Sequence, residues 1–269
     1  MADLKTIINC AKYGLFGASL AVWIFILWKA SRGRPVLALQ PQEPVSWPSL
    51  PVGATFLVAY TLPLLLVGLV APGDMLRGVQ ARCGALVIQG LVVVGLLSRA
   101  GPLRKEDFGC ESLRWRGDLL AGVAGFFASL IPVFVVAAAL KNAGWRGPDD
   151  KHQFFKILDS DSGNTILAWI ALSVVVAAPL AEELMYRVLL LGWTKSQITP
   201  WKAILFSAAV FTLAHGEHDW LPLFPLALIL GYVYHKRHSY LAVVVLHALF
   251  NATNVAMAVL ANQESKVPG

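Results

Sequence analysis

Long apolar segments constrain the fold of this chain more than any other feature. Eight of them follow one another along the sequence, at about 7–28, 52–71, 82–98, 118–140, 164–192, 201–215, 219–234 and 240–260. A helix needs about 20 apolar residues to cross the hydrocarbon core of a bilayer. Among regular structures, only helices and closed barrels satisfy their backbone hydrogen bonds there. We therefore expect an all-α, polytopic integral membrane protein with about eight transmembrane helices.

The charged residues support a membrane protein rather than a nucleic-acid-binding one. Only 14% of the 269 residues are charged and 57% are hydrophobic, whereas soluble domains carry about 25% charged residues. The net charge is +6, but the cations lie mainly between the apolar runs, where they act as topology signals. We expect membrane lipid as a partner, no nucleic acid, and a multi-pass protein of a bacterial inner membrane.

The cations are distributed unequally between the two sets of connections. Those after odd-numbered runs contain Lys29, Arg32, Arg34, Arg99, Arg104, Lys105, Arg114, Arg116, Lys195, Lys202, Lys236 and Arg237. The other side has fewer: Lys5, Arg77, Arg82, Lys141, Arg146, Lys151, Lys156 and Lys266. Because cytoplasmic loops carry the excess of Lys and Arg, this pattern favours both termini outside.

Ionisable and strongly polar residues inside the apolar runs are the candidate functional residues, since buried charge is costly and is retained mainly for function. In the stretch "AEELMYR", Glu183 and Arg187 are four residues apart. Residues at this spacing share a helix face, and the acid-first order favours an ion pair. Glu182 points about 100° away and has no cation at this spacing. The spacing therefore predicts that the Glu183 carboxylate is structural and paired with Arg187, whereas the Glu182 carboxylate has no cation on its own helix face.

Two further runs each place polar side chains one turn apart. Phe211 and His215 occupy "FTLAHG", and His247 and Asn251 occupy "LHALFNAT". Each pair alone is typical of a helix cap or of a hydrogen bond between helices. Their combination with the acid doublet, on three separate apolar runs, favours a functional site.

The three motifs, EExxxR at 182–187, FxxxH at 211–215 and HxxxN at 247–251, resemble those of the CPBP (CAAX protease and bacteriocin-processing, Abi) family of intramembrane proteases. We assign this resemblance to residues 118–262, which would form the protease core. Residues 1–117 would form N-terminal transmembrane helices and connecting segments without a specific signal.

The resemblance implies hydrolysis of a peptide bond within the membrane, acting on a peptide or lipidated peptide, with CAAX-type prenyl-protein processing as one candidate reaction. It implies that Glu182 and His215 activate water, that His247 and Asn251 bind the oxyanion, and that Glu183, Arg187 and Phe211 support them. A zinc site of Glu182, His215 and His247 is the alternative. We favour a mechanism without metal, because the chain has no HExxH helix and because Asn251 suits an oxyanion better than zinc.

Two other functions remain open at this stage. A non-catalytic scaffold or bacteriocin-immunity-type protein of the same family would use the same helices to bind a partner. An ion-coupled transporter would use the polar cluster as an ion site, but the first four runs show no inverted repeat of the last four, which many transporters contain.

Overall fold

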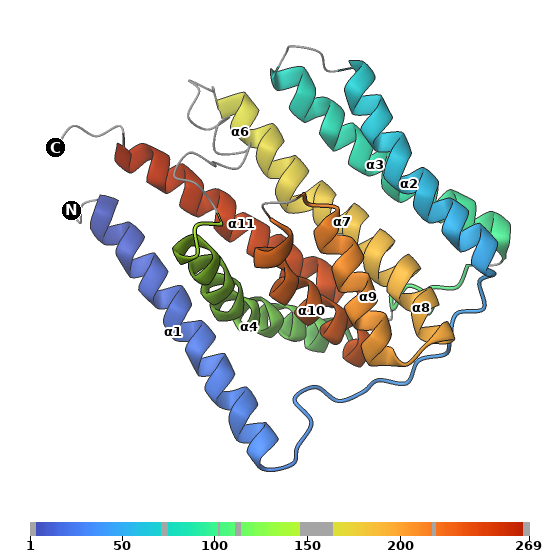
Figure 1. Ribbon diagram of the computed structural model, residues 1–269, viewed down its shortest axis with the longest axis horizontal. Coiled ribbons are helices and arrows are strands. Elements are labelled where there is room, and N and C mark those ends of the chain that lie inside the picture. The colour runs from blue at the N-terminus through green and yellow to red at the C-terminus, as the bar shows by residue number, and fades with distance from the viewer. Residues whose placement is uncertain are drawn as a thin grey trace.

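The protein is a bundle of helices (Figure 1). The computed structural model describes residues 4–70, 75–101, 103–110, 114–145, 164–216 and 219–265, and within these ranges every regular element is helical. The elements are α1 (Leu4–Ser31), α2 (Ser49–Val70), α3 (Met75–Ala100), α4 (Trp115–Asn142), α6 (Asn164–Ala171), η2 (Leu172–Ala177), α7 (Ala178–Glu183), η3 (Leu184–Leu191), α8 (Gly192–Gln197), α9 (Pro200–Leu213), α10 (Trp220–Arg237) and α11 (Tyr240–Ser265).

Each of the eight predicted membrane runs has a helical counterpart, which confirms the all-α polytopic class. Six of these helices are long and apolar enough to cross a membrane. The other two are α9, with 14 residues, and α10, with 18. The chain is therefore a multi-pass membrane protein in which two C-terminal helices are shorter than the rest.

The helix that carries the acid doublet is continuous from α6 to α8, and we call it the motif helix. It is interrupted by two π-helical segments, η2 and η3, which lie on either side of α7. π-Helical turns are rare and often occur at functional sites. Here they bracket the six residues that end with Glu182 and Glu183.

Helix α4 lies among α1, α10 and α11, while α3 packs against both α2 and the motif helix. Two glycines let α4 and α11 approach closely. A Cβ on Gly122 would lie 2.6 Å from the Ala242 carbonyl oxygen, and one on Gly125 would lie 2.5 Å from Leu246 Cδ1. The resulting core includes residues from both halves of the chain, such as Val93 and Leu230. The division at residue 117 remains a prediction.

One end of the bundle gathers the cations that follow the odd-numbered runs, and we call it the basic end. Residues 32–48 cross it as an irregular strap, because the prolines in this segment disfavour a helix. Gln42 joins the strap to two helix ends: its Nε2 donates to the His235 carbonyl at 2.8 Å, and its Oε1 accepts from Lys195 Nζ. Nearby, Arg237 Nη2 binds Asp118 Oδ1 at 2.7 Å. The described chain ends, Leu4 and Ser265, lie at the opposite end, here called the far end (Figure 1).

Candidate active site

The structure brings three predicted site residues from three helices to one point. Glu182 ends near two histidines: its Oε2 lies 3.8 Å from His215 Nε2 and 3.9 Å from His247 Nε2. His215 lies two residues after the end of α9, and His247 lies on α11. The side chain of Glu182 is 16% exposed and that of His215 is 27% exposed. A small molecule can therefore reach the carboxylate and the His215 ring.

Hydrogen bonds to the other nitrogen of each ring define the histidine tautomers. His215 Nδ1 lies 2.7 Å from the Phe211 carbonyl oxygen. A carbonyl only accepts hydrogen bonds, so Nδ1 carries the proton and, in the neutral ring, Nε2 presents its lone pair. His247 Nδ1 lies 2.7 Å from Glu183 Oε1, and the same argument applies when that carboxyl is ionised. Both neutral rings thus direct an Nε2 lone pair into the space next to Glu182.

Glu183 is buried and connects two other site residues. Its Oε2 lies 3.1 Å from Arg187 Nε, and both side chains are at most 1% exposed. This confirms the ion pair predicted from the spacing of four residues. The second bond of Glu183, to His247, joins residues 64 positions apart and could not be read from spacing within one helix. Glu183 therefore both neutralises Arg187 and orients a histidine of the site.

Phe211 lies at the centre of the aromatic packing around these charges. The Arg187 guanidinium sits over its ring, 4.4 Å from the centroid, an arrangement that favours the cation. The rings of His215 and His247 lie 4.5 and 5.8 Å from Phe211 by centroid. Tyr186 packs edge-on against the same ring at 5.1 Å. Phe211 thus spaces the two histidines and covers the buried arginine.

Asn251 belongs to the same region but donates to the backbone. Its Nδ2 donates to the Val174 carbonyl in η2 at 2.8 Å. A carboxamide has two N–H donors, so one N–H of Asn251 is used by this bond and the second is left over. The contact fixes the side chain of Asn251 against a π-helical turn, which sequence reasoning did not predict.

The donor atoms of the three convergent residues are further apart than the ligand atoms of a zinc site. Zinc bonds of about 2.0–2.1 Å in a tetrahedron place neighbouring ligand atoms about 3.4 Å apart. The separations of 3.8 and 3.9 Å are longer. Across the described ranges, no three His, Cys, Asp or Glu side chains form a group that could hold a metal ion. As placed, the three side chains do not match the ligand spacing of a tetrahedral zinc site.

Comparison with known proteins identifies the region that contains these residues. A family model described as "Type II CAAX prenyl endopeptidase Rce1-like" matches residues 164–253, about one third of the chain. No curated protein and no solved structure matches the chain. The matched region runs from the start of the motif helix through Asn251 and contains all three motifs. Through residues 164–253, the chain is similar to the Rce1-like family of type II CAAX prenyl endopeptidases, which agrees with the resemblance of its three motifs to the CPBP family.

Proposed function

We propose that this protein is an intramembrane endopeptidase that hydrolyses a peptide bond with a water activated by Glu182 and His215. One observation carries the proposal: Glu182 Oε2 and the two Nε2 atoms surround one space, at separations of 3.8 and 3.9 Å. A water oxygen can lie about 2.8 Å from each of two acceptors at this separation. The water would donate one hydrogen to Glu182 and the other to His215.

The reaction follows from these positions. The water oxygen adds to the carbonyl carbon of the scissile bond as Glu182 takes its proton, which is general-base catalysis. The carbonyl oxygen becomes an oxyanion. The tetrahedral intermediate then collapses, the carbon–nitrogen bond breaks, and the proton held by Glu182 moves to the leaving nitrogen. The products are a carboxylic acid and an amine, and no other reactant is needed.

The oxyanion would be stabilised by His247 and Asn251. His247 can donate from Nε2 only as an imidazolium, because its other proton is on Nδ1. Glu183, which accepts from Nδ1 at 2.7 Å, orients the ring so that Nε2 faces the reaction space. Asn251 would supply its second N–H. Preorganised donors of this kind contribute about 10²–10³ each to the rate.

We further propose that this chemistry needs no resident metal. The donor separations exceed those of a tetrahedral zinc centre, and Asn251 supplies an amide donor rather than a good metal ligand. Dialysis against a strong chelator should leave both the activity and the melting temperature unchanged. Stoichiometric zinc in the purified protein, with activity restored only by adding zinc, would refute this part.

Purified protein in proteoliposomes tests the central proposal. The assay uses a farnesylated CaaX peptide and a panel of hydrophobic peptides, with cleavage followed by mass spectrometry. Glu182→Gln should reduce cleavage by about 10²–10⁴, the usual contribution of a general base. The control is Glu43→Gln, which changes an 80% exposed glutamate of the strap and should keep full activity. Equal cleavage by the wild type and Glu182→Gln would show that this carboxylate is not the base.

The scaffold alternative makes a different prediction with the same variant. If the protein acts only by binding a partner, Glu182→Gln should preserve the cellular phenotype, while packing variants such as Gly122→Ala abolish it. If the protein acts as a protease, the phenotype should follow cleavage activity instead.

A further inference from the structure

The carbonyl group of Val174, in η2, has no main-chain donor in its own helix. In an α- or π-helical turn, the donor is the N–H of the residue four or five positions later, here Ala178 or Pro179. The N–H of Ala178 donates to the Ser173 carbonyl instead, and proline has no N–H. Val174 lies in a helix long and apolar enough to cross a membrane, where an unpaired backbone carbonyl is costly. The turn therefore needs a donor from another part of the protein.

Asn251 is that donor. Its Nδ2 lies 2.8 Å from the Val174 carbonyl oxygen, although the two residues are 77 positions apart. A carbonyl only accepts hydrogen bonds, so the contact determines which end of the carboxamide faces η2. It also keeps the side chain from bonding to carbonyls of its own helix, as asparagine often does. Because the carboxamide is planar and one N–H is bound to Val174, the position of this carbonyl sets the direction of the second N–H.

A second proline of the protein recruits a donor in the same way. Pro132 lies inside α4, and an interior proline removes the N–H that would bond to the carbonyl four residues before it. That carbonyl belongs to Ala128, and it accepts from Trp23 Nε1 of α1 at 3.0 Å. Trp23 lies outside the candidate active site, whereas Asn251 is part of it. Pro132 is therefore a matched control for Pro179.

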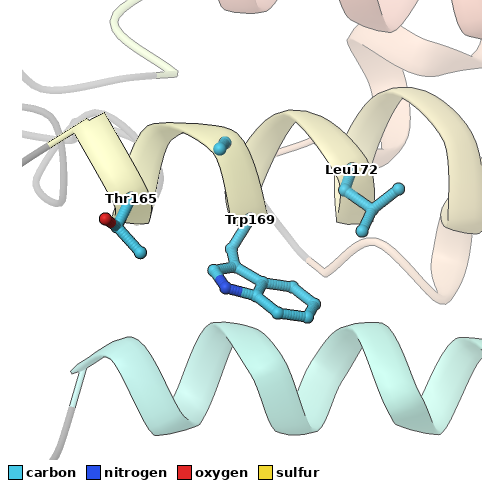
Figure 2. A pocket seen from close by; sticks show the side chains of 4 residues that line it. Thr165, Trp169 and Leu172 are labelled. Atoms are coloured by element: carbon cyan, nitrogen blue, oxygen red, sulfur yellow. The ribbon is translucent and has the colours of Figure 1, made fainter.

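Packing on both sides of η2 keeps the π turn in place. Before the turn, Trp169 of α6 packs against a cluster that includes Leu86 of α3, and Figure 2 shows its indole directed from the motif helix toward a neighbouring helix. After the turn, Glu183 and Arg187 are fully buried. Conversion of η2 into regular α-helix would rotate one of these parts against the other by about 100°. We therefore expect the turn to persist when Pro179 is replaced.

We propose that Pro179 is a positioning residue for Asn251. By leaving the Val174 carbonyl without a main-chain donor, it holds the carboxamide so that its second N–H meets the oxyanion. The anchoring of Asn251 rests on the geometry alone, and its effect on the reaction rests, in addition, on the proposed function. Pro179 and Glu182 both belong to α7. One short segment thus supplies the general base and orients a donor on another helix.

The state of the carboxamide tests the anchoring without any need for activity. The protein is labelled with ¹⁵N in its asparagine side chains and studied by NMR in detergent, and the Asn251 signal is identified by its absence in Asn251→Ala. In the wild type, one of its two Nδ2 protons should show the downfield shift and small temperature dependence of a hydrogen-bonded proton. Pro179→Ala adds an N–H five residues after Val174, the spacing of a π bond, which should take over the carbonyl. The hydrogen-bonded signal should therefore be lost in Pro179→Ala and kept in Pro132→Ala.

Two outcomes of this experiment would overturn the proposal. One is a hydrogen-bonded Asn251 signal that is the same in Pro179→Ala as in Pro132→Ala. The other is a wild-type carboxamide that lacks this signal. The second measurement needs no change at position 179, so it decides the question even if Pro179→Ala does not fold.

Kinetics in the peptide assay test the consequence for the reaction. Pro179→Ala should lower kcat by about 10- to 100-fold with KM unchanged, since displacing a catalytic group by about 1 Å can cost about 10²-fold. Pro132→Ala should keep the wild-type kcat. In the Asn251→Ala background, Pro179→Ala should cause no further loss, because its effect acts through that carboxamide.

The kinetic outcomes separate this proposal from the proposed function. Equal losses from Pro179→Ala in both backgrounds would overturn the positioning role, because they would show a structural effect that does not act through Asn251. Equal kcat values for the wild type and Pro179→Ala would also overturn it, while the assignment as a protease would stand. If the wild type cuts no peptide but the carboxamide signals behave as expected, the anchoring stands, and it is the assignment as a protease that fails.

Discussion

Replacing Arg187 with alanine should destabilise the protein strongly, because it leaves a buried carboxylate without its cation. Glu183 is fully buried, and its Oε2 lies 3.1 Å from Arg187 Nε. Removing one partner of a buried pair costs about 3–5 kcal/mol. The contact with the Phe211 ring, at 4.4 Å, is lost as well. For a chain of roughly this size, 1 kcal/mol shifts the melting temperature by about 2–4 °C, so the expected decrease is about 6–20 °C.

The double variant Arg187→Met/Glu183→Gln separates the lost pair from the lost packing. Replacing both charges of a buried pair by groups of similar volume is often close to neutral. The double variant should therefore melt well above Arg187→Ala. It should nevertheless be impaired in cleavage, because a neutral carboxamide in place of the Glu183 carboxylate is a weaker acceptor for His247.

Apparent melting temperatures in one detergent, followed by intrinsic fluorescence, provide the measurement. Glu43→Ala is the control, since the side chains of Glu43 and its partner Arg104 are 80% and 51% exposed and exposed pairs contribute about 0–1 kcal/mol. The reasoning is refuted if Arg187→Ala melts within about 2 °C of the wild type, which would correspond to roughly 1 kcal/mol or less. It is also refuted if the double variant melts no higher than Arg187→Ala.

Three further outcomes are expected. Asn251→Ala should lower kcat by about 10²–10³ in the peptide assay while peptide binding is kept, and an unchanged kcat would remove it from the oxyanion site. Burial and the nearby Lys195 and Lys236 lower the pKa of His235 to about 4. Between that value and about 6.5, the unfolded chain binds more protons at this residue than the folded chain does. The stability of the fold should therefore decrease as the pH falls through this window. His235→Gln should flatten that part of the pH–stability profile, and an identical profile would contradict the assignment. Gly122→Ala should destabilise by about 1–3 kcal/mol, because its Cβ would lie 2.6 Å from a backbone oxygen; Gly17→Ala, which has open space, is the control in the same melting assay.

The parts of the fold and site that depend on local spacing could be predicted from the sequence. Long apolar runs specify membrane helices because the bilayer sets their length. The pairing of Glu183 with Arg187 followed from a spacing of four residues, because such residues share a helix face whatever the rest of the protein does. Glu182 was expected on another face, toward the histidines, and its Oε2 does lie near both Nε2 atoms.

The contacts that depend on packing between helices could not be predicted in this way. The bond from His247 to Glu183 and that from Asn251 to Val174 each join distant parts of the chain. They depend on the rotation of α11 against the motif helix. The π-helical segments could not be predicted either, because no pattern in a single amino-acid sequence marks a helical turn that contains one extra residue. The attachment of the strap through Gln42 was missed because glutamine in a connection usually faces water.

The π-helical segments uncouple the orientation of the acids from the length of their helix. Each residue added to or removed from a regular α-helix turns everything beyond it by about 100°, but a π turn accommodates one extra residue locally. The doublet lies between two such turns. A single deletion within Leu184–Leu191 that restored regular α-helix would therefore leave the residues beyond it facing as they do now, whereas a deletion within α7 would turn the two sides of the helix against each other. Homologous helices without these turns would align with this one only with a one-residue gap at each turn.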